Sequence, residues 1–258
     1  MLKKRLIGVI TVKNGYAVQS FGYNKYLPLG DPCVLVENLD RWGVDEIILQ
    51  CIDRSSNKLG PDLALLERIS SEGRATPLVY SGGINSEKSA VSAIQAGADR
   101  VCIDSLLHDS PQSIEGISNR LGAQALIASL PVSYDTEGFK WLDYRTGKLK
   151  DLDGQVVELL QNKIISEAFV IDWKNEGYKS QFDMQLLSKF PFINIPLIAF
   201  GGLSEPEQLK EALLLPNVTA VAIGNFLAYS EHAVQSYKTQ LSGIPMRDAF
   251  YGCDGADK

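Results

Sequence analysis

Eight short runs rich in β-branched residues recur along this chain, and an amphipathic segment follows each of them. The predicted strands are Arg5–Val12, Asp45–Ile52, Thr76–Tyr80, Asp99–Ile103, Ala125–Leu130, Glu167–Ile171, Ile195–Phe200 and Val218–Ile223. The predicted helices are Asp31–Trp42, Asp62–Ser71, Ser86–Ala96, Pro111–Leu121, Leu152–Asn162, Asp183–Phe190, Glu205–Leu215 and Phe226–Leu241. Strands that alternate with helices form parallel β-α-β units. Eight such units in 258 residues predict one closed (β/α)8 TIM barrel.

The chain also repeats itself at about half its length. Gly82-Gly83 matches Gly201-Gly202 after 119 positions, and Asp104-Ser105 matches Gly224-Asn225 after 120. Glu46 matches Glu167 after 121 positions. A repeat unit this long contains four β-α pairs, so it predicts a pseudo-twofold half-barrel repeat rather than a solenoid. We expect half-barrels at about 1–122 and 123–245, followed by a C-terminal tail at 246–258.

Charge and hydropathy exclude several classes of partner. A formal net charge of −6 argues against nucleic acid and anionic membrane, which favour basic surfaces. The longest apolar runs, such as Leu197–Phe200 and Val218–Ile223, are far shorter than the roughly 20 residues of a membrane span. The N-terminus shows no signal-peptide core. We therefore expect a cytoplasmic protein.

Cysteine and histidine usage gives no sign of a metal or cofactor. The four cysteines, Cys33, Cys51, Cys102 and Cys253, are scattered without a C-x-x-C pair, which argues against a disulfide or zinc site. His108 and His232 fall in predicted loops or helix starts, and we interpret both as ordinary surface residues. The sequence predicts neither a cofactor nor a metal.

Small residues follow four of the predicted strands, where the active site of such a barrel lies. Glycine allows backbone N–H groups to approach a phosphate closely, and a following helix N-terminus adds favourable partial charge. The pseudo-twofold repeat would place two such sites on opposite sides of the mouth, as suits a substrate with a phosphate at each end. The alternative is that these glycines only form tight turns. The predicted phosphate-binding residues are Gly82, Gly83, Asp104, Ser105, Gly201, Gly202, Gly224 and Asn225.

Several segments together resemble the cyclase subunit (HisF) of imidazole glycerol phosphate synthase, in one register from about residue 2 to 245. These segments are Leu2–Ile7, Val12–Gly15, Gly43–Glu46, Ser81–Ile84, Ala96–Val101 and Ile198–Gly202. The resemblance implies a barrel that receives ammonia from a HisH-like glutaminase. It also implies that a phosphorylated small molecule binds at the mouth.

The chain departs from that family at the positions of its ring-closing chemistry. The family has a catalytic Asp at the ends of strands one and five, where this chain has Thr11 and Pro131. Ring closure needs a proton donor and a proton acceptor, and neither side chain serves near neutral pH. Cys51 replaces an Asp near the end of strand two, and Gln19 replaces a lysine of the first loop. Catalytic residues therefore stay unknown, with weak substitute candidates Asp53, Asp172 and Glu176.

The opposite end of the barrel keeps the family's pattern. The resemblance implies an ammonia gate made of Arg5, Glu46, Arg100 and Glu167, and each of these residues begins a predicted strand. Period-2 alternation allows all four to point inward, where two acids and two bases would balance. The alternative is a structural salt-bridge plug. Asp99 matches a family position that contacts the glutaminase.

These features favour a HisF-like amidotransferase subunit that docks a HisH-like glutaminase and channels ammonia to a non-histidine acceptor. The expected destination, implied by the resemblance, is amidation of a surface-glycan sugar with a separate sugar amidotransferase. One alternative is a genuine cyclase subunit of histidine biosynthesis with relocated catalytic groups. Another is a non-catalytic phosphosugar-binding barrel.

An insertion at 133–150 reads as a β-hairpin with turns at Asp135–Gly138 and Arg145–Lys148. Its aromatic residues either cover the mouth, contact a partner or pack as a surface hairpin. Residues 251–258 read as a disordered tail.

Overall fold

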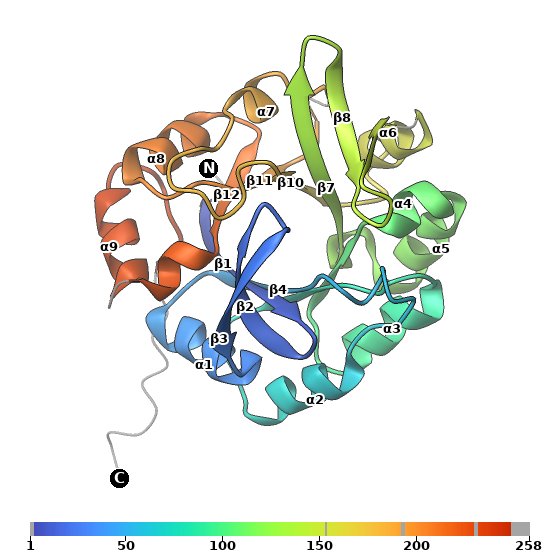
Figure 1. The fold of residues 1–258 in the computed structure, drawn as a ribbon, viewed down its shortest axis with the longest axis horizontal. Coiled ribbons are helices and arrows are strands. Elements are labelled where there is room, and N and C mark those ends of the chain that lie inside the picture. The colour runs from blue at the N-terminus through green and yellow to red at the C-terminus, as the bar shows by residue number, and fades with distance from the viewer. Residues whose placement is uncertain (1–2, 153, 192–193, 230–231, 249–258) are drawn as a thin grey trace.

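Eight parallel strands close into a ring in the computed structural model, which describes residues 3–152, 154–191, 194–229 and 232–248. The strands are β1 (Arg5–Lys13), β4 (Glu46–Cys51), β5 (Leu78–Ser81), β6 (Arg100–Ile103), β7 (Leu126–Asp135), β10 (Glu167–Asp172), β11 (Leu197–Phe200) and β12 (Val218–Ile223). Each pairs with the next in this order, and β12 pairs with β1 to complete the ring (Figure 1). The predicted TIM barrel is confirmed.

Helices surround the ring, mostly where the sequence predicts them. They are α1 (Pro32–Trp42), α2 (Leu63–Ser71), α3 (Glu87–Gln95), α4 (Ser105–Asp109), α5 (Gln112–Leu121), α6 (Gly154–Gln161), α7 (Gln185–Ser188), α8 (Pro206–Leu214) and α9 (Ala233–Gln240). The first three begin directly after the capping residues Asp31, Asp62 and Ser86, whose side chains accept backbone N–H groups of the first turn. Because capping residues end the extended chain, these helix starts were readable from the sequence.

Four differences from the expected helices stand out. Helix α4 was not predicted, and α7 is shorter than the expected 183–190. The expected final helix, 226–241, is a 3-10 turn (η2, Asn225–Ala228) followed by α9. A second 3-10 turn (η1, Ala123–Ala125) leads into β7.

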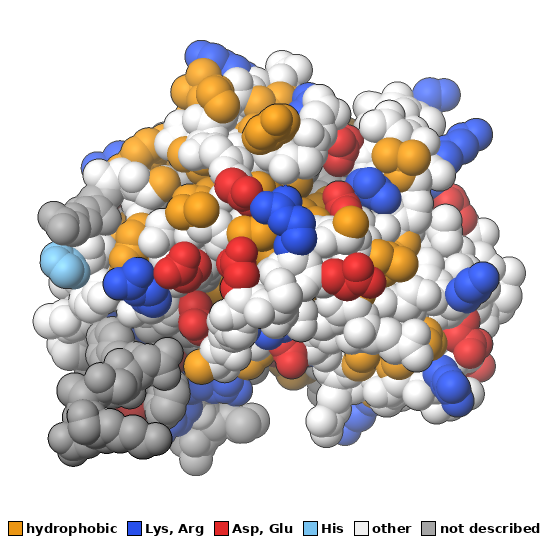
Figure 2. Space-filling view, turned by 90° about the horizontal axis from the view of Figure 1, so that it is seen from below, with side chains coloured by type: hydrophobic (Ala, Val, Ile, Leu, Met, Phe, Trp, Pro, Cys, Tyr) orange, Lys and Arg blue, Asp and Glu red, His pale blue; other side chains and the backbone are white. Residues whose placement is uncertain are grey.

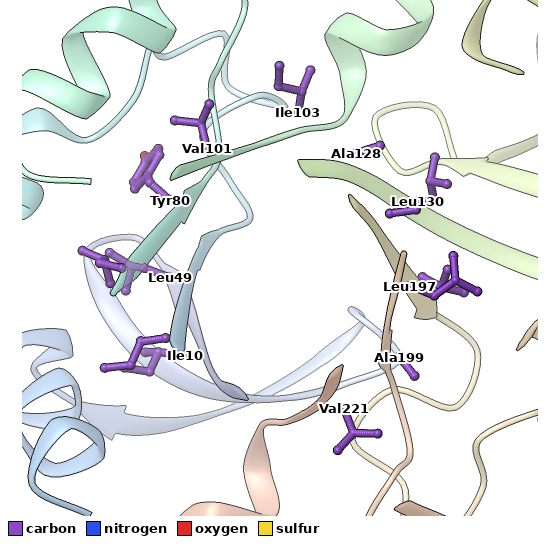
Figure 3. Close-up of a cluster of buried hydrophobic side chains, with 14 of the residues drawn as sticks. Ile10, Leu49, Tyr80, Val101, Ile103, Ala128, Leu130, Leu197, Ala199 and Val221 are labelled. Atoms are coloured by element: carbon purple, nitrogen blue, oxygen red, sulfur yellow. The ribbon is translucent and has the colours of Figure 1, made fainter. Parts of the chain in front are cut away.

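Side chains of the ring strands form two separate apolar layers. Those labelled in Figure 3, such as Ile10, Leu49 and Leu130, point outward from the ring and pack in the large core beneath the helices. Alternate residues, including Ile7, Ile48 and Phe169, form a second buried cluster inside the ring. This division follows from the period-2 alternation of a strand. Burying both faces explains why the strands read as nearly continuous apolar runs.

Two antiparallel additions rise from the mouth of the barrel (Figure 1). Strand β1 continues into a hairpin of β2 (Tyr16–Phe21) and β3 (Lys25–Gly30), which the sequence does not predict. Strand β7 continues into β8 (Gly138–Asp143) and β9 (Lys148–Asp151), with turns where they were predicted. Both additions therefore stand where the ligand site of such a barrel lies.

The half-chain repeat appears in the backbone of the strand ends. Gly82 and Gly83 have φ of 133° and 68°, and their partners Gly201 and Gly202 have 109° and 81°. A Cβ at Gly82 would lie 2.3 Å from the Cys51 carbonyl oxygen, and one at Gly201 would lie 2.4 Å from that of Asp172. Matched conformations with matched close approaches explain why both pairs are glycine.

The chain beyond residue 245, expected as a tail, is joined to the barrel as far as Asp248. The Lys4 N–H donates to the Pro245 carbonyl at 2.7 Å, and the Arg247 N–H donates to the Lys4 carbonyl at 2.9 Å. The rest of the expected tail, including 251–258, lies outside the described residues. Within the described residues, no helix is both long and apolar enough to cross a membrane. On the face shown in Figure 2, basic side chains are interspersed with acidic ones and form no single patch.

Candidate functional site

Arg5, Glu46, Arg100 and Glu167 meet at the N-terminal end of the barrel and form a closed ring of ion pairs. Arg5 binds Glu46 at 2.9 Å and also pairs with Glu167. Arg100 binds Glu46 at 3.0 Å and Glu167 at 2.7 Å. The four side chains are at most 15% exposed, so the charges neutralise one another away from bulk water. We call these four residues the charge ring.

Neighbouring polar groups fix the geometry of the charge ring. Arg100 also donates to the Gln124 carbonyl and the Ser166 hydroxyl, at 2.9 and 2.8 Å. Thr219 donates its hydroxyl to Glu167 at 2.9 Å. Burial opposes ionisation of Glu167, but Arg5 and Arg100 outweigh it and hold the pKa of Glu167 below its ordinary value. Glu167 therefore stays charged at neutral pH.

Asp99, the expected partner-contact residue, lies next to the charge ring. Its side chain is 51% exposed and pairs with Arg74 at 2.8 Å. It also accepts the Leu78 N–H at 2.8 Å, which joins the starts of β5 and β6. Asp99 thus combines a structural role with an exposed carboxylate on the N-terminal face of the barrel, which we call the lower face.

At the opposite end, a cavity of about 420 Å³ opens at the mouth. Its lining comes from the ends of β4, β5, β6 and β7, from the β2–β3 hairpin and from β8 and the turn after it. Hydroxyl groups are prominent in this lining, from Ser55, Ser81, Ser105, Ser129, Tyr23 and Tyr144. Cys102 and Ile171 belong both to the lining and to the apolar cluster inside the ring, so the floor of the cavity is the top of that cluster.

The four residues of the first predicted phosphate site all line this cavity. They are Gly82, Gly83, Asp104 and Ser105. The Gly83 N–H already donates to the Ser55 hydroxyl at 3.1 Å. The charged residues of the cavity lining are Lys13, Asp53 and Asp104. The structure thus brings the four residues together, but it places a carboxylate rather than a cation among them.

The second predicted phosphate site is covered by the chain itself. The Asn225 side chain donates to the Ser20 carbonyl at 2.7 Å and accepts the Ser20 N–H at 3.2 Å. A Cβ on Gly202 would meet the Asn175 carbonyl oxygen at 2.8 Å, and Gly201 is equally crowded. Strand β2 therefore packs against Asn225 and the loop after β10 packs against Gly202, and the phosphate role of Gly201, Gly202, Gly224 and Asn225 stays a prediction.

The positions that lack the family's carboxylates lie on both sides of the mouth. Pro131 and Cys51 line the large cavity. Thr11 is 6% exposed and instead lines a small cavity of about 40 Å³ beside Gly224 and Asn225. Gln19 lies in β2, paired with Leu27 of β3. Thr11, Pro131 and Cys51 thus supply no carboxyl group, and Gln19 supplies no positive charge.

Of the three substitute candidates, Asp53 alone lines the large cavity, where it accepts the Asn14 N–H at 2.7 Å. Asp172 accepts from the Asn175 side chain and the Asp183 N–H, both at 2.8 Å, and burial raises its pKa. Glu176 accepts from the Ser20 hydroxyl at 2.8 Å, and burial also raises its pKa. The carboxylates of Asp172 and Glu176 thus hold loops in place.

The sequence predicts a phosphate-binding role for Asp104 and gives no direct sign that its pKa is raised. Burial raises the pKa of Asp104 to about 8, against smaller opposing effects of Arg145 and Trp141. Trp141 is fully buried and stacks on His108 with ring centroids 3.4 Å apart, so His108 is not the ordinary surface residue we expected. The aromatic residues of the 133–150 insertion were the signal in the sequence, because apolar side chains that cover the mouth would bury Asp104.

The cysteines, the remaining candidate metal ligands, form no cluster among the described residues. Cys33, Cys51 and Cys102 are buried free thiols, and Cys253 lies outside the described residues. Across the part of the chain that the structure describes, no group of three His, Cys, Asp or Glu side chains has a metal-binding arrangement.

Comparison with known proteins gives a consistent result along the whole barrel. The family described as "Histidine biosynthesis protein" matches residues 5–233. An imidazole glycerol phosphate synthase subunit HisF of Thermococcus gammatolerans is 30% identical over 96% of this chain and 99% of its own length. The HisF of Pyrococcus furiosus is 29% identical over the same shares. A Vibrio vulnificus protein with the provisional name imidazole glycerol phosphate synthase subunit hisF2 is 30% identical over 93% of this chain and 89% of its own.

The matched range covers all eight strands of the ring and includes the charge ring. The chain therefore belongs to the histidine biosynthesis protein family, as a HisF-like member.

Proposed function

We propose that this protein is a HisF-like amidotransferase subunit that docks a HisH-like glutaminase on its lower face and conducts ammonia through the barrel. The proposed acceptor is not the histidine precursor but a surface-glycan sugar, amidated together with a separate sugar amidotransferase. The observation that carries the proposal is the contrast between the two ends of the barrel. The charge ring is complete at one end, while Thr11 and Pro131 stand at the other where carboxylates were expected.

The interior of the barrel suits a small neutral molecule. Above the charge ring lie apolar side chains such as Ile7, Ile48 and Phe169, and this cluster reaches the cavity floor at Cys102. Moving an ammonium ion into such surroundings is strongly unfavourable, whereas neutral ammonia carries no charge to desolvate. Glu46 and Glu167 would retain ammonium at the entrance. A path along this axis would therefore select the neutral form.

The mouth cavity suits a small hydroxylated acceptor. Its volume of about 420 Å³ lies within the range of about 300–1,000 Å³ typical of small-molecule sites. Ser105, Ser129 and Tyr144 offer hydroxyl groups that donate and accept hydrogen bonds with a sugar-like ligand. This supports a polar acceptor at the point where ammonia would leave the barrel.

A genuine cyclase remains the second candidate, favoured by the relatives named as imidazole glycerol phosphate synthase subunits. In that case Asp53 is the substitute that already lines the cavity. The cyclase predicts formation of imidazole glycerol phosphate and loss of this product in Asp53→Asn.

The test is glutamate release by the HisH-like glutaminase with and without this protein, together with an assay for imidazole glycerol phosphate. We expect glutamate release to rise without imidazole product. Asp99→Lys should weaken the stimulation because Asp99 is exposed on the lower face. Glu37→Lys makes the same charge change on the outer surface of α1 and should leave the stimulation intact. Imidazole product, or no stimulation at all, would overturn the proposal.

A further inference from the structure

The mouth cavity carries a charge pattern that opposes phosphate. Its lining contains Lys13, Asp53 and Asp104, so acids outnumber bases. Lys13 is also engaged, with its ammonium group 3.6 Å from the centre of the Tyr26 ring. A phosphate placed between Gly83 and Ser105 would lie beside Asp104, and the two would repel once Asp104 ionises, above its pKa of about 8.

Asp104 is the group that most needs a partner. One of its carboxyl oxygens, Oδ1, is buried and has no hydrogen-bond partner of good geometry among the described residues, although the Trp141 indole N–H lies near enough to lower the pKa of Asp104 slightly. A buried acceptor without a donor lowers stability, so such a group marks a position that a ligand can satisfy. Asp104 also lines the cavity, so a ligand seated there would lie next to its side chain.

The nearest base does not fill that role. Arg145 influences Asp104 but is committed elsewhere, with Nη2 3.0 Å from Asp109 and Nε 3.0 Å from Asp143. The charged and titratable groups around Asp104, from β6, α4, β8 and its turn, and the β2–β3 turn, are Cys102, Asp109, Asp143, Tyr144, Arg145 and Tyr23. Cys102, Tyr144 and Tyr23 are neutral, since burial raises the pKa of each. Asp109 and Asp143 pair with Arg145, and Lys150 also pairs with Asp143 at 2.8 Å, so these charges offset one another and Asp104 is left without a cation of its own.

We propose that the mouth cavity binds a nitrogen cation, such as ammonium, a protonated amine or an amidinium, with Asp104 as its anionic partner. If the ligand arrives as a neutral amine, the proton of the Asp104 carboxyl passes to the amine nitrogen and an ion pair forms. The hydroxyls of Ser105 and Tyr144 line the same cavity and can accept the remaining N–H groups. This assignment goes beyond the proposed function, because it concerns binding by this chain alone.

The experiment follows the indole N–H signal of Trp141 by NMR in the full-length protein, without glutaminase, while methylammonium chloride or sodium phosphate is added. Trp141 is the right reporter because its ring is buried against Asp104. Methylammonium should shift the signal to saturation, and phosphate at the same concentration and ionic strength should not. Binding should strengthen from about pH 6 to about pH 9, since an alkylammonium stays protonated across this range while Asp104 ionises.

Asp104→Asn keeps the side-chain size and removes the charge, so methylammonium binding should weaken about tenfold or more. Asp53→Asn is the matched control, because it removes the other acid of the same cavity and should change binding by less than about threefold. Phosphate binding by the wild type, no methylammonium shift, or equal binding by Asp104→Asn would each overturn the proposal. Should Asp104→Asn fail to fold, a wild-type affinity that does not change with pH would overturn it instead.

Discussion

Replacing Glu46 with Gln tests whether the charge ring is a closed, buried network. The substitution keeps the side-chain shape but removes one of two negative charges. Arg5 and Arg100 then share Glu167 as the one acid of the ring, and each loses an ion pair of 2.9 or 3.0 Å, because the glutamine keeps a single neutral acceptor oxygen. The ring changes from neutral to a net charge of +1 in a place where the Glu46 side chain is 4% exposed.

The expected loss follows from that burial. Removing one partner of a buried ion pair leaves an uncompensated charge and costs about 3–5 kcal/mol. Arg100 keeps its bonds to Ser166 and the Gln124 carbonyl, so we expect the lower end, about 3 kcal/mol. For a chain of this size, this corresponds to a fall in Tm of about 6–12 °C.

Urea unfolding followed by circular dichroism measures the change, with Glu37→Gln as the control. Glu37 makes an exposed pair with Arg41 on α1, which is worth only about 0.3–0.5 kcal/mol. The double variant Glu46→Gln, Arg100→Met restores charge balance, so its loss should be smaller than the sum of the two single losses.

A loss below about 1 kcal/mol for Glu46→Gln would refute this reasoning, because it would equal the exposed pair. The ring would then be hydrated and open in solution. Such a result would also weaken the argument that its acids hold back ammonium.

Three further predictions concern other parts of the molecule. Gly177→Ala should destabilise the protein by about 1–3 kcal/mol and speed proteolysis in the 21–24 turn, because φ is +80° and the new Cβ would lie 2.0 Å from the Ser20 carbonyl oxygen. The control is Gly147→Ala, where φ is +68° but the space around the new Cβ is open. Similar proteolysis of both variants would contradict the explanation. Folded Asp104, with its pKa of about 8, keeps a proton that the unfolded chain releases near pH 4, so the free energy of unfolding should fall between about pH 4 and about pH 8. Urea unfolding measured across this range should show a shallower fall for Asp104→Asn than for the wild type. An equal dependence of the unfolding free energy on pH in both proteins would be evidence against the raised pKa. Burial raises the pKa of the Cys33 thiol to about 11 and that of Cys51 to about 12, so both should react with a thiol reagent much more slowly in native than in urea-unfolded protein, and equal rates would contradict their burial.

The ring of strands could be predicted because each strand carries its own signal. Residues 197–200 and 218–223 are apolar on both faces, and caps such as Asp62 and Ser86 mark where helices begin. The β2–β3 hairpin escaped prediction because its residues are partly exposed and include Pro28, so neither strand shows an apolar run.

The candidate site was predictable only where backbone conformation or charge balance fixed a residue type. Paired glycines and the charge ring were visible in the sequence for this reason. Asp104 looked like part of a phosphate site because its neighbours in sequence suit one. Trp141 and Tyr144, which interact with Asp104, lie about 40 residues away in sequence and reach it only through the fold, so the burial that raises its pKa has no local sequence signal.

The β2–β3 hairpin gives the two halves of the mouth unequal roles. Ser20 accepts a hydrogen bond from Asn225 through its carbonyl and donates its hydroxyl to Glu176, so the chain itself closes one half of the mouth. The other half keeps the large cavity. A barrel built from a repeat would otherwise present two equivalent sites, and a ligand could enter in either of two orientations. With one half closed, we expect binding to saturate at one ligand per chain, in a single orientation relative to the barrel axis.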